Sequence, residues 1–174
     1  MALGLISDFA NNMQGAIANS LDAIVPVLKN VFADNSYESE AKLRSIVALG
    51  DLSLAGEKQF MNHFESVFES LLQAAMYSLK KPDNEEEGVV LTQLKEALLE
   101  GYVAILYGMN CDRDFKGNCD EKVERCCYQI FQYLEQLVLN CTDSSFSPSL
   151  ILEIFNLFMD IARMFLGGLE QDLT

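Results

Sequence analysis

The chain has 174 residues, half of them hydrophobic, with no Trp and one His. This length can bury a substantial core, either as one globular domain or as roughly three to four helical repeats. Twenty-six acidic against twelve basic residues give a formal charge of −14, and a surface of that sign repels nucleic-acid phosphates and anionic lipid. We therefore expect no nucleic-acid partner. No apolar window reaches the roughly 18 to 20 residues that cross a bilayer, so we also expect no membrane insertion.

Apolar side chains recur with helical spacing along almost the whole chain. Short polar, Pro-containing or Gly-containing stretches separate the apolar runs and mark where each helix ends. The helices predicted from this pattern, in chain order, cover about 2–13, 19–33, 36–54, 60–79, 89–109, 120–139 and 147–165.

Three of the separating stretches carry specific expectations. Ala55-Gly56-Glu57 is predicted to end the third helix before the fourth begins. The acidic stretch 83–88 is predicted to be a mobile surface loop, and 110–118 is a second polar insertion. Pro148 suits the first turn of the last helix.

The helices group into pairs, which predicts one repeat array over 1–174 with a last helix that lacks its partner. We therefore expect a section of a longer array. The approximate repeats cover 2–33, 37–81 and 89–140, with an incomplete one at 147–168.

A short motif of apolar, small, Asp, apolar and small residues recurs around Asp8, Asp51 and Asp160, with Met159 as the one departure from it. The spacings are 43 and 109 positions, and the longer one fits two repeats lengthened by insertions. Periods of about 40 to 47 built from helix pairs are typical of HEAT and armadillo arrays. The predicted fold is therefore an all-α solenoid of HEAT repeats. Since an anion late in a helix opposes the helix dipole, we expect these aspartates to be structural and to accept hydrogen bonds from the neighbouring repeat.

The sequence offers no constellation typical of a catalytic, metal or phosphate site, so we expect no enzymatic activity and no cofactor. His63 is the single histidine, which rules out a multi-histidine metal site, and no Gly-rich phosphate loop follows a strand. The cysteines match no common zinc spacing, and reduced thiols are expected because no secretory leader is visible. They lie at Cys111, Cys119, Cys126, Cys127 and Cys141.

Two predicted helices carry acids at spacings that place them on one face. Glu65 and Glu69 are four positions apart, Glu121 and Glu124 are three apart, and Glu135 follows on the same helix as the second pair. Such carboxylates could pair with Arg and Lys of a bound helix. The alternative is a solvated polar face, which periodicity alone favours.

Three blocks of sequence resemble the importin-β (karyopherin-β) nuclear transport receptors, and in particular their C-terminal HEAT repeats. The first runs from Ile46 to Ala55 and is followed by Phe60, the second is Leu71-Leu72-Gln73-Ala74-Ala75, and the third runs from Leu94 to Tyr102. The resemblance covers most of the chain and weakens in the polar insertion. The third repeat also lacks the Asp of the recurring motif.

The resemblance implies a receptor that carries cargo through the nuclear pore, in the cytoplasm and the nucleus. It implies outer A helices and inner B helices, with B helices at 19–33, 60–79 and 120–139. The implied partners are a basic importin-α-type adaptor or basic cargo, Phe-Gly nucleoporins and, through the full-length receptor, the Ran GTPase. On this basis Glu65, Glu69, Glu121, Glu124 and Glu135 are the candidate partner-binding acids.

Three hypotheses about function therefore stand. A section of a transport receptor predicts salt-sensitive binding to an Arg/Lys-rich helix and binding to Phe-Gly repeats. A generic HEAT scaffold for a multiprotein complex predicts stacking without either kind of binding. An enzyme predicts turnover, for which the sequence offers no candidate residues.

Overall fold

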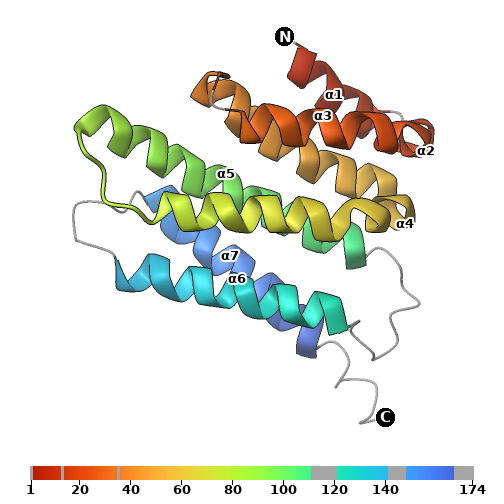
Figure 1. Ribbon diagram of the computed structural model, residues 1–174. Helices are drawn as coiled ribbons and strands as arrows, with labels where there is room; N and C mark the ends of the chain where they lie inside the picture. Colours follow the sequence, from red (N-terminus) through yellow and green to blue (C-terminus); the bar gives the residue numbers. More distant parts are fainter. Residues whose placement is uncertain (1, 13, 35, 111–120, 141–147, 167–174) are drawn as a thin grey trace.

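The computed structural model describes residues 2–12, 14–34, 36–110, 121–140 and 148–166, and the elements within these ranges are all helical. This confirms the all-α prediction. A short 3-10 helix, η1 (Ala18–Ser20), precedes α3. The α-helices in Figure 1 are α1 (Ala2–Asn12), α2 (Gln14–Ile17), α3 (Leu21–Ala33), α4 (Ser39–Ser78), α5 (Glu85–Asn110), α6 (Glu121–Leu139) and α7 (Pro148–Leu166).

The long helix α4 reverses its direction within its own length. A Cβ built on Gly101 of α5 would lie 3.0 Å from Ile46 Cγ2, and the ring centroids of Phe68 and Tyr102 are 5.6 Å apart. Ile46 and Phe68 would be about 33 Å apart along a straight helix. Because they contact consecutive residues of α5, the two halves of α4 must lie side by side.

We call residues 39–54 the first arm of α4 and residues 60–78 the second arm. Figure 1 shows the first arm in light orange below α3 and the second arm returning in yellow. The predicted helix end at Ala55-Gly56-Glu57 is wrong, because helical structure continues through the whole of α4. The direction nevertheless changes between the arms. Gly56 allows α3 to approach there, since a Cβ at this position would lie 2.6 Å from Leu21 Cδ1.

Successive helices stack in parallel with a nearly constant offset in sequence. The first arm of α4 lies beside α5, α5 lies beside α7, and the second arm lies beside α6 (Figure 1). Parallel stacking of helix pairs at a constant offset defines a solenoid, so the predicted helical-repeat architecture is confirmed. Hydrogen bonds between helices join residues 51 to 55 positions apart, among them Ser53 with Ala104, Ser78 with Tyr133, Glu96 with Ser149, and Tyr107 with Asp160.

A chain of aromatic rings fills the core between these helices. Phe64 contacts Phe68, Phe68 contacts Tyr102, and Tyr102 contacts Tyr133, with ring centroids 5.6 to 6.3 Å apart. The hydroxyl of Tyr133 lies 2.8 Å from that of Ser78, whereas the hydroxyl of Tyr102 is buried and has no hydrogen-bond partner among the described residues. Burial raises the pKa of both tyrosines, so both remain protonated.

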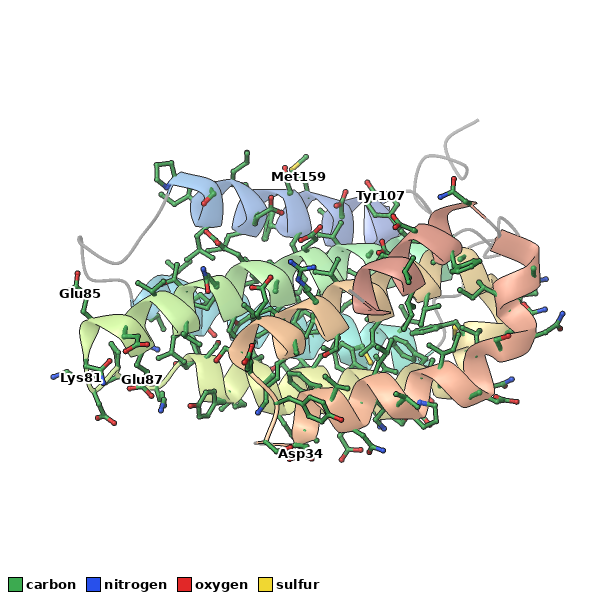
Figure 2. The ribbon with its side chains drawn as sticks, turned by 90° about the horizontal axis from the view of Figure 1, so that it is seen from above. Asp34, Lys81, Glu85, Glu87, Tyr107 and Met159 are labelled. Carbon is green, nitrogen blue, oxygen red and sulfur yellow. The ribbon has the colours of Figure 1, made fainter. Side chains whose placement is uncertain are left out.

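The acidic stretch 83–88 differs from its prediction, because most of it is the first turn of α5, which begins at Glu85. The side chain of Asn84 caps this turn by accepting a hydrogen bond of 2.9 Å from the backbone N–H of Glu87. Acids are favoured at a helix N-terminus by the dipole, and the Glu87 carboxylate also pairs with Lys80. Figure 2 shows Glu85 and Glu87 at this end of α5.

The last described helix, α7, begins at Pro148, in agreement with the predicted role of this proline. Figure 2 shows Met159 on the side of α7 that points away from α5. None of the described helices is both long and apolar enough to cross a bilayer. The exposed large apolar side chains of α7 are Ile151, Leu152, Phe155, Phe158 and Met159.

Several predictions concern residues that the structure does not describe. Apart from Asn110, the polar insertion lies outside the described residues, and so do Cys111, Cys119, Cys141 and the glycine pair at 167–168. Cys126 and Cys127 are buried in α6. Burial raises the pKa of the Cys126 thiol to about 11, so it stays protonated near neutral pH.

Candidate partner-binding surface

The five acids predicted to contact a partner lie on two neighbouring helical segments. Glu65 and Glu69 are on the second arm of α4, while Glu121, Glu124 and Glu135 are on α6, and all five are exposed. We call these five residues the acidic surface. Glu135 follows Glu124 at a distance of about 16 Å along the helix. The surface therefore extends along most of α6.

An ion pair joins the two segments of the acidic surface. Arg125 Nη2 of α6 lies 3.8 Å from Glu65 Oε1 of the second arm, and the side chains are 66% and 56% exposed. A pair that is long and open to solvent contributes little to stability. The pair does show that Glu65 of the second arm lies within reach of Arg125 of α6.

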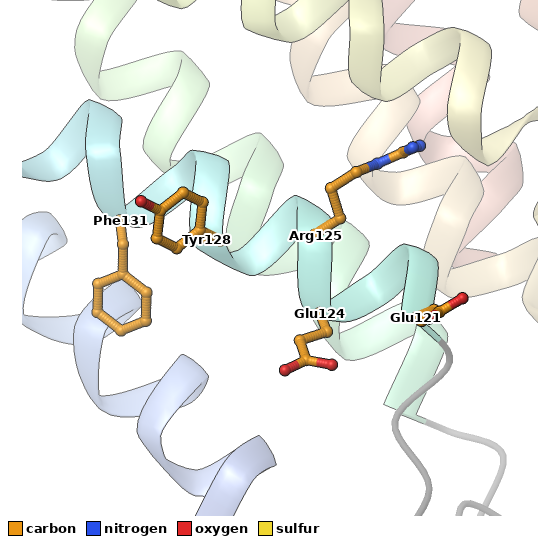
Figure 3. A pocket seen from close by; sticks show the side chains of 5 residues that line it. All are labelled: Glu121, Glu124, Arg125, Tyr128 and Phe131. Carbon is orange, nitrogen blue, oxygen red and sulfur yellow. The ribbon is translucent and has the colours of Figure 1, made fainter.

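A pocket of about 480 Å³ opens on α6 beside this ion pair. Its lining combines two carboxylates, one guanidinium and two aromatic rings. Figure 3 shows Arg125 extending toward α4, while Glu124 and Phe131 point toward α7. The ring of Phe131 meets Phe158 of α7 edge-on, with centroids 5.6 Å apart. The lining residues are Glu121, Glu124, Arg125, Tyr128 and Phe131.

The three aspartates of the recurring motif lie in different surroundings. Asp8 on α1 is exposed, and Asp51 on the first arm is half-buried. Asp160 on α7 accepts a hydrogen bond of 3.0 Å from the hydroxyl of Tyr107 on α5, which is the preceding parallel helix. That these three are equivalent structural positions of the repeat stays a prediction.

A second group of acids lies across the first arm, α5 and α7. Burial is the main cause of a raised pKa of the Glu100 carboxyl on α5, and the charges of Glu153 on α7 and Asp51 on the first arm raise it further. These acids are thus close enough to repel one another. Their proximity reflects the stacking of the first arm, α5 and α7. When all three acids are ionised, their repulsion lowers the free energy of unfolding.

Comparison with known families shows which family this stacked array belongs to. Residues 1–173 match the family model described as importin subunit beta-1-like, TPR repeats. The chain belongs to this family. The resemblance drawn from the three sequence blocks is therefore confirmed over nearly the whole chain.

The repeats of this importin subunit beta-1-like chain are long. Hydrogen bonds between stacked helices, such as those of Ser53 with Ala104 and Ser78 with Tyr133, span 51 to 55 positions. TPR units contain about 34 residues and HEAT units about 40 to 47, so the spacing here lies closer to the HEAT value. Both kinds of repeat are helix pairs that bury their apolar faces by stacking.

In this importin subunit beta-1-like chain, three residues of the pocket on α6 were not among the candidate residues predicted from the sequence, namely Arg125, Tyr128 and Phe131. Arg125 follows Glu121 by four positions, so its place on the same face could have been predicted from helical periodicity. Its pairing with Glu65 could not, since that contact joins segments 60 positions apart. Tyr128 is 64% exposed, which apolar periodicity does not indicate.

Proposed function

We propose that this chain is a section of a nuclear import receptor whose acidic surface binds a basic adaptor or cargo segment. In this proposal α1 with α3, the two arms of α4, and α5 with α6 are three helix pairs, and α7 begins a fourth. The second arm and α6 are B helices, and their acids face the partner. The chain thereby contributes to the transport of proteins between cytoplasm and nucleus.

The single observation that carries the proposal is the contact between Arg125 and Glu65. It brings Glu65 of the second arm within reach of α6, and this supports the proposal that a bound basic helix pairs with carboxylates of both helices at once. The net charge of −14 gives the long-range attraction that speeds encounter with a basic partner. Family membership supplies the connection to nuclear transport.

The family also supports the remaining partners. Phe-Gly nucleoporins and, through the full-length receptor, the Ran GTPase are proposed to bind this class of receptor. Residence in the cytoplasm, the nucleus and the nuclear pore follows from that role. The mode of action is binding without catalysis.

A salt titration tests the proposal directly. An immobilised Arg/Lys-rich adaptor peptide should retain the chain at low salt and release it at high salt, because exposed ion pairs are screened. Absence of retention at low salt, with the chain folded, would instead favour a generic HEAT scaffold. Retention that does not change with salt would contradict an electrostatic surface.

A charge-matched pair of variants shows whether the acidic surface itself is responsible. Glu69→Gln with Glu121→Gln should weaken peptide binding by about five- to thirtyfold at low salt, at a cost of roughly 0.5–1 kcal/mol for each lost ion pair. Glu85→Gln with Glu86→Gln makes the same change in net charge at the exposed start of α5. Equal weakening by both double variants would assign the effect to net charge alone.

A further inference from the structure

We propose that Arg125 is an internal competitor of the partner, because it engages Glu65 until a basic side chain of the partner displaces it. The inference rests on the proposed function and adds the residue that limits affinity at the acidic surface. Arg125 would then be a residue that sets specificity and would not itself bind the partner.

The position of Arg125 is that of a cation among the acids. Its guanidinium reaches Glu65 on the second arm of α4. On α6 it lines the same pocket as Glu121 and Glu124, four positions and one position before it in the sequence. Figure 3 shows the guanidinium extending toward α4. An Arg or Lys side chain of a bound helix that contacted Glu65 Oε1 would compete with Arg125 for that oxygen.

The ion pair between Arg125 and Glu65 is long and exposed, so it can be broken at little cost in free energy. Charge-assisted bonds in tight pairs measure about 2.7–2.9 Å, and the pair between Arg44 and Glu40 is 2.7 Å long. The pair between Arg125 and Glu65 is 3.8 Å long, with both side chains more than half exposed. Water screens both charges, so moving Arg125 aside leaves no buried charge without a partner.

Displacement still limits affinity in two ways. First, a cation of the partner must replace the ion pair that Glu65 already makes with Arg125. The displaced guanidinium also stays on α6, near Tyr128, where its positive charge repels a basic partner. Removing the charge of Arg125 should therefore tighten binding of a basic peptide and make it more sensitive to salt.

The experiment measures the affinity of the full chain for a fluorescent Arg/Lys-rich helical peptide by anisotropy at low and high salt. Arg125→Gln and Arg125→Ala should each tighten binding by about two- to fivefold at low salt and converge on the unsubstituted chain at high salt. The matched control is Lys81→Gln, which makes the same change in net charge at an exposed position beyond α4. It should change affinity by less than about twofold.

A double-mutant cycle ties the effect to Glu65. In a Glu65→Gln background, Arg125→Gln should gain less than about half of what it gains alone, because there is no carboxylate left to compete for. A gain that persists in full, a gain equal to that of Lys81→Gln, or weaker binding would overturn the inference and leave the proposed function standing. If neither the unsubstituted chain nor any folded variant binds the peptide at low salt, both proposals fail.

Discussion

Gly108 of α5 is where the packing of the first arm against α5 can be tested most sharply. A Cβ at this position would lie 2.5 Å from the carbonyl oxygen of Ser53, 2.7 Å from its carbonyl carbon and 3.0 Å from its hydroxyl oxygen. Two of these atoms are backbone, so no change of rotamer relieves the clash. Gly108→Ala must push the first arm and α5 apart.

The cost can be worked out from three contributions. Overpacking of a close contact costs about 1–3 kcal/mol. Separating the helices also weakens the 3.1 Å bond from the Ser53 hydroxyl to the carbonyl of Ala104, worth at most about 1 kcal/mol because the same hydroxyl donates to the carbonyl of Gly50 at 2.6 Å. Alanine regains about 1 kcal/mol through its higher helix propensity. The net expectation for Gly108→Ala is a loss of roughly 1–3 kcal/mol in the free energy of unfolding.

Gly88, in the first turn of α5, provides the matched control. A Cβ there would lie 3.8 Å from Pro82, which is an ordinary van der Waals contact. Gly88→Ala should therefore raise the free energy of unfolding by up to about 1 kcal/mol. For a chain of this size each kcal/mol shifts Tm by about 2–4 °C, so the two variants should move Tm in opposite directions.

Thermal unfolding followed by circular dichroism, with urea titration for the free energy, distinguishes the two variants. Gly108→Ala should lower Tm by roughly 2–12 °C. If it is as stable as the unsubstituted chain while Gly88→Ala is stabilised as expected, the first arm does not pack against α5 at Ser53. The reversal of α4 would then be misplaced.

Two further predictions concern buried polar groups. Tyr133→Phe removes the hydrogen bond to Ser78 and should lower the free energy of unfolding by about 0.5–1.5 kcal/mol. Tyr102→Phe removes a hydroxyl that has no partner in the described part of the chain and should leave stability unchanged or higher. Urea titration of both variants checks this order. Burial, followed by the charge of Glu153, raises the pKa of Glu100. Ionised Glu100 therefore lowers the free energy of unfolding at pH values above the raised pKa, and this cost is absent below the ordinary pKa of 4.5. Glu100→Gln should therefore stabilise the chain at pH 7 and lose this advantage as the pH falls toward 4, and an equal gain at both pH values would contradict the assignment.

Much of the fold could be predicted from local sequence. The periodic apolar residues of 120–139 predicted α6 within one residue of its observed bounds, and Pro148 predicted the start of α7. Both predictions succeed because an amphipathic helix with a defined first turn depends on residues close together in the chain. The three blocks that resemble importin-β likewise predicted the family.

Local sequence predicted helix boundaries less well at stretches that can either interrupt a helix or form part of one. The acids of 83–88 were expected in a loop, but Asn84 provides a cap that lets the helix begin among them. Gly56 was expected to end a helix, whereas α4 continues through it and changes direction. Composition identifies such stretches as boundaries. It does not decide whether the chain breaks, bends or starts a helix there.

The candidate site divides in the same way. The sequence by itself determined that Glu65 and Glu69 share one helical face and that Glu121 and Glu124 share another, because helical periodicity fixes which residues of a helix point together. Only the tertiary structure decided that Arg125 of α6 reaches Glu65 of the second arm. Stacking sets that register through contacts between residues more than fifty positions apart, and the period of a single helix carries no information about its neighbour.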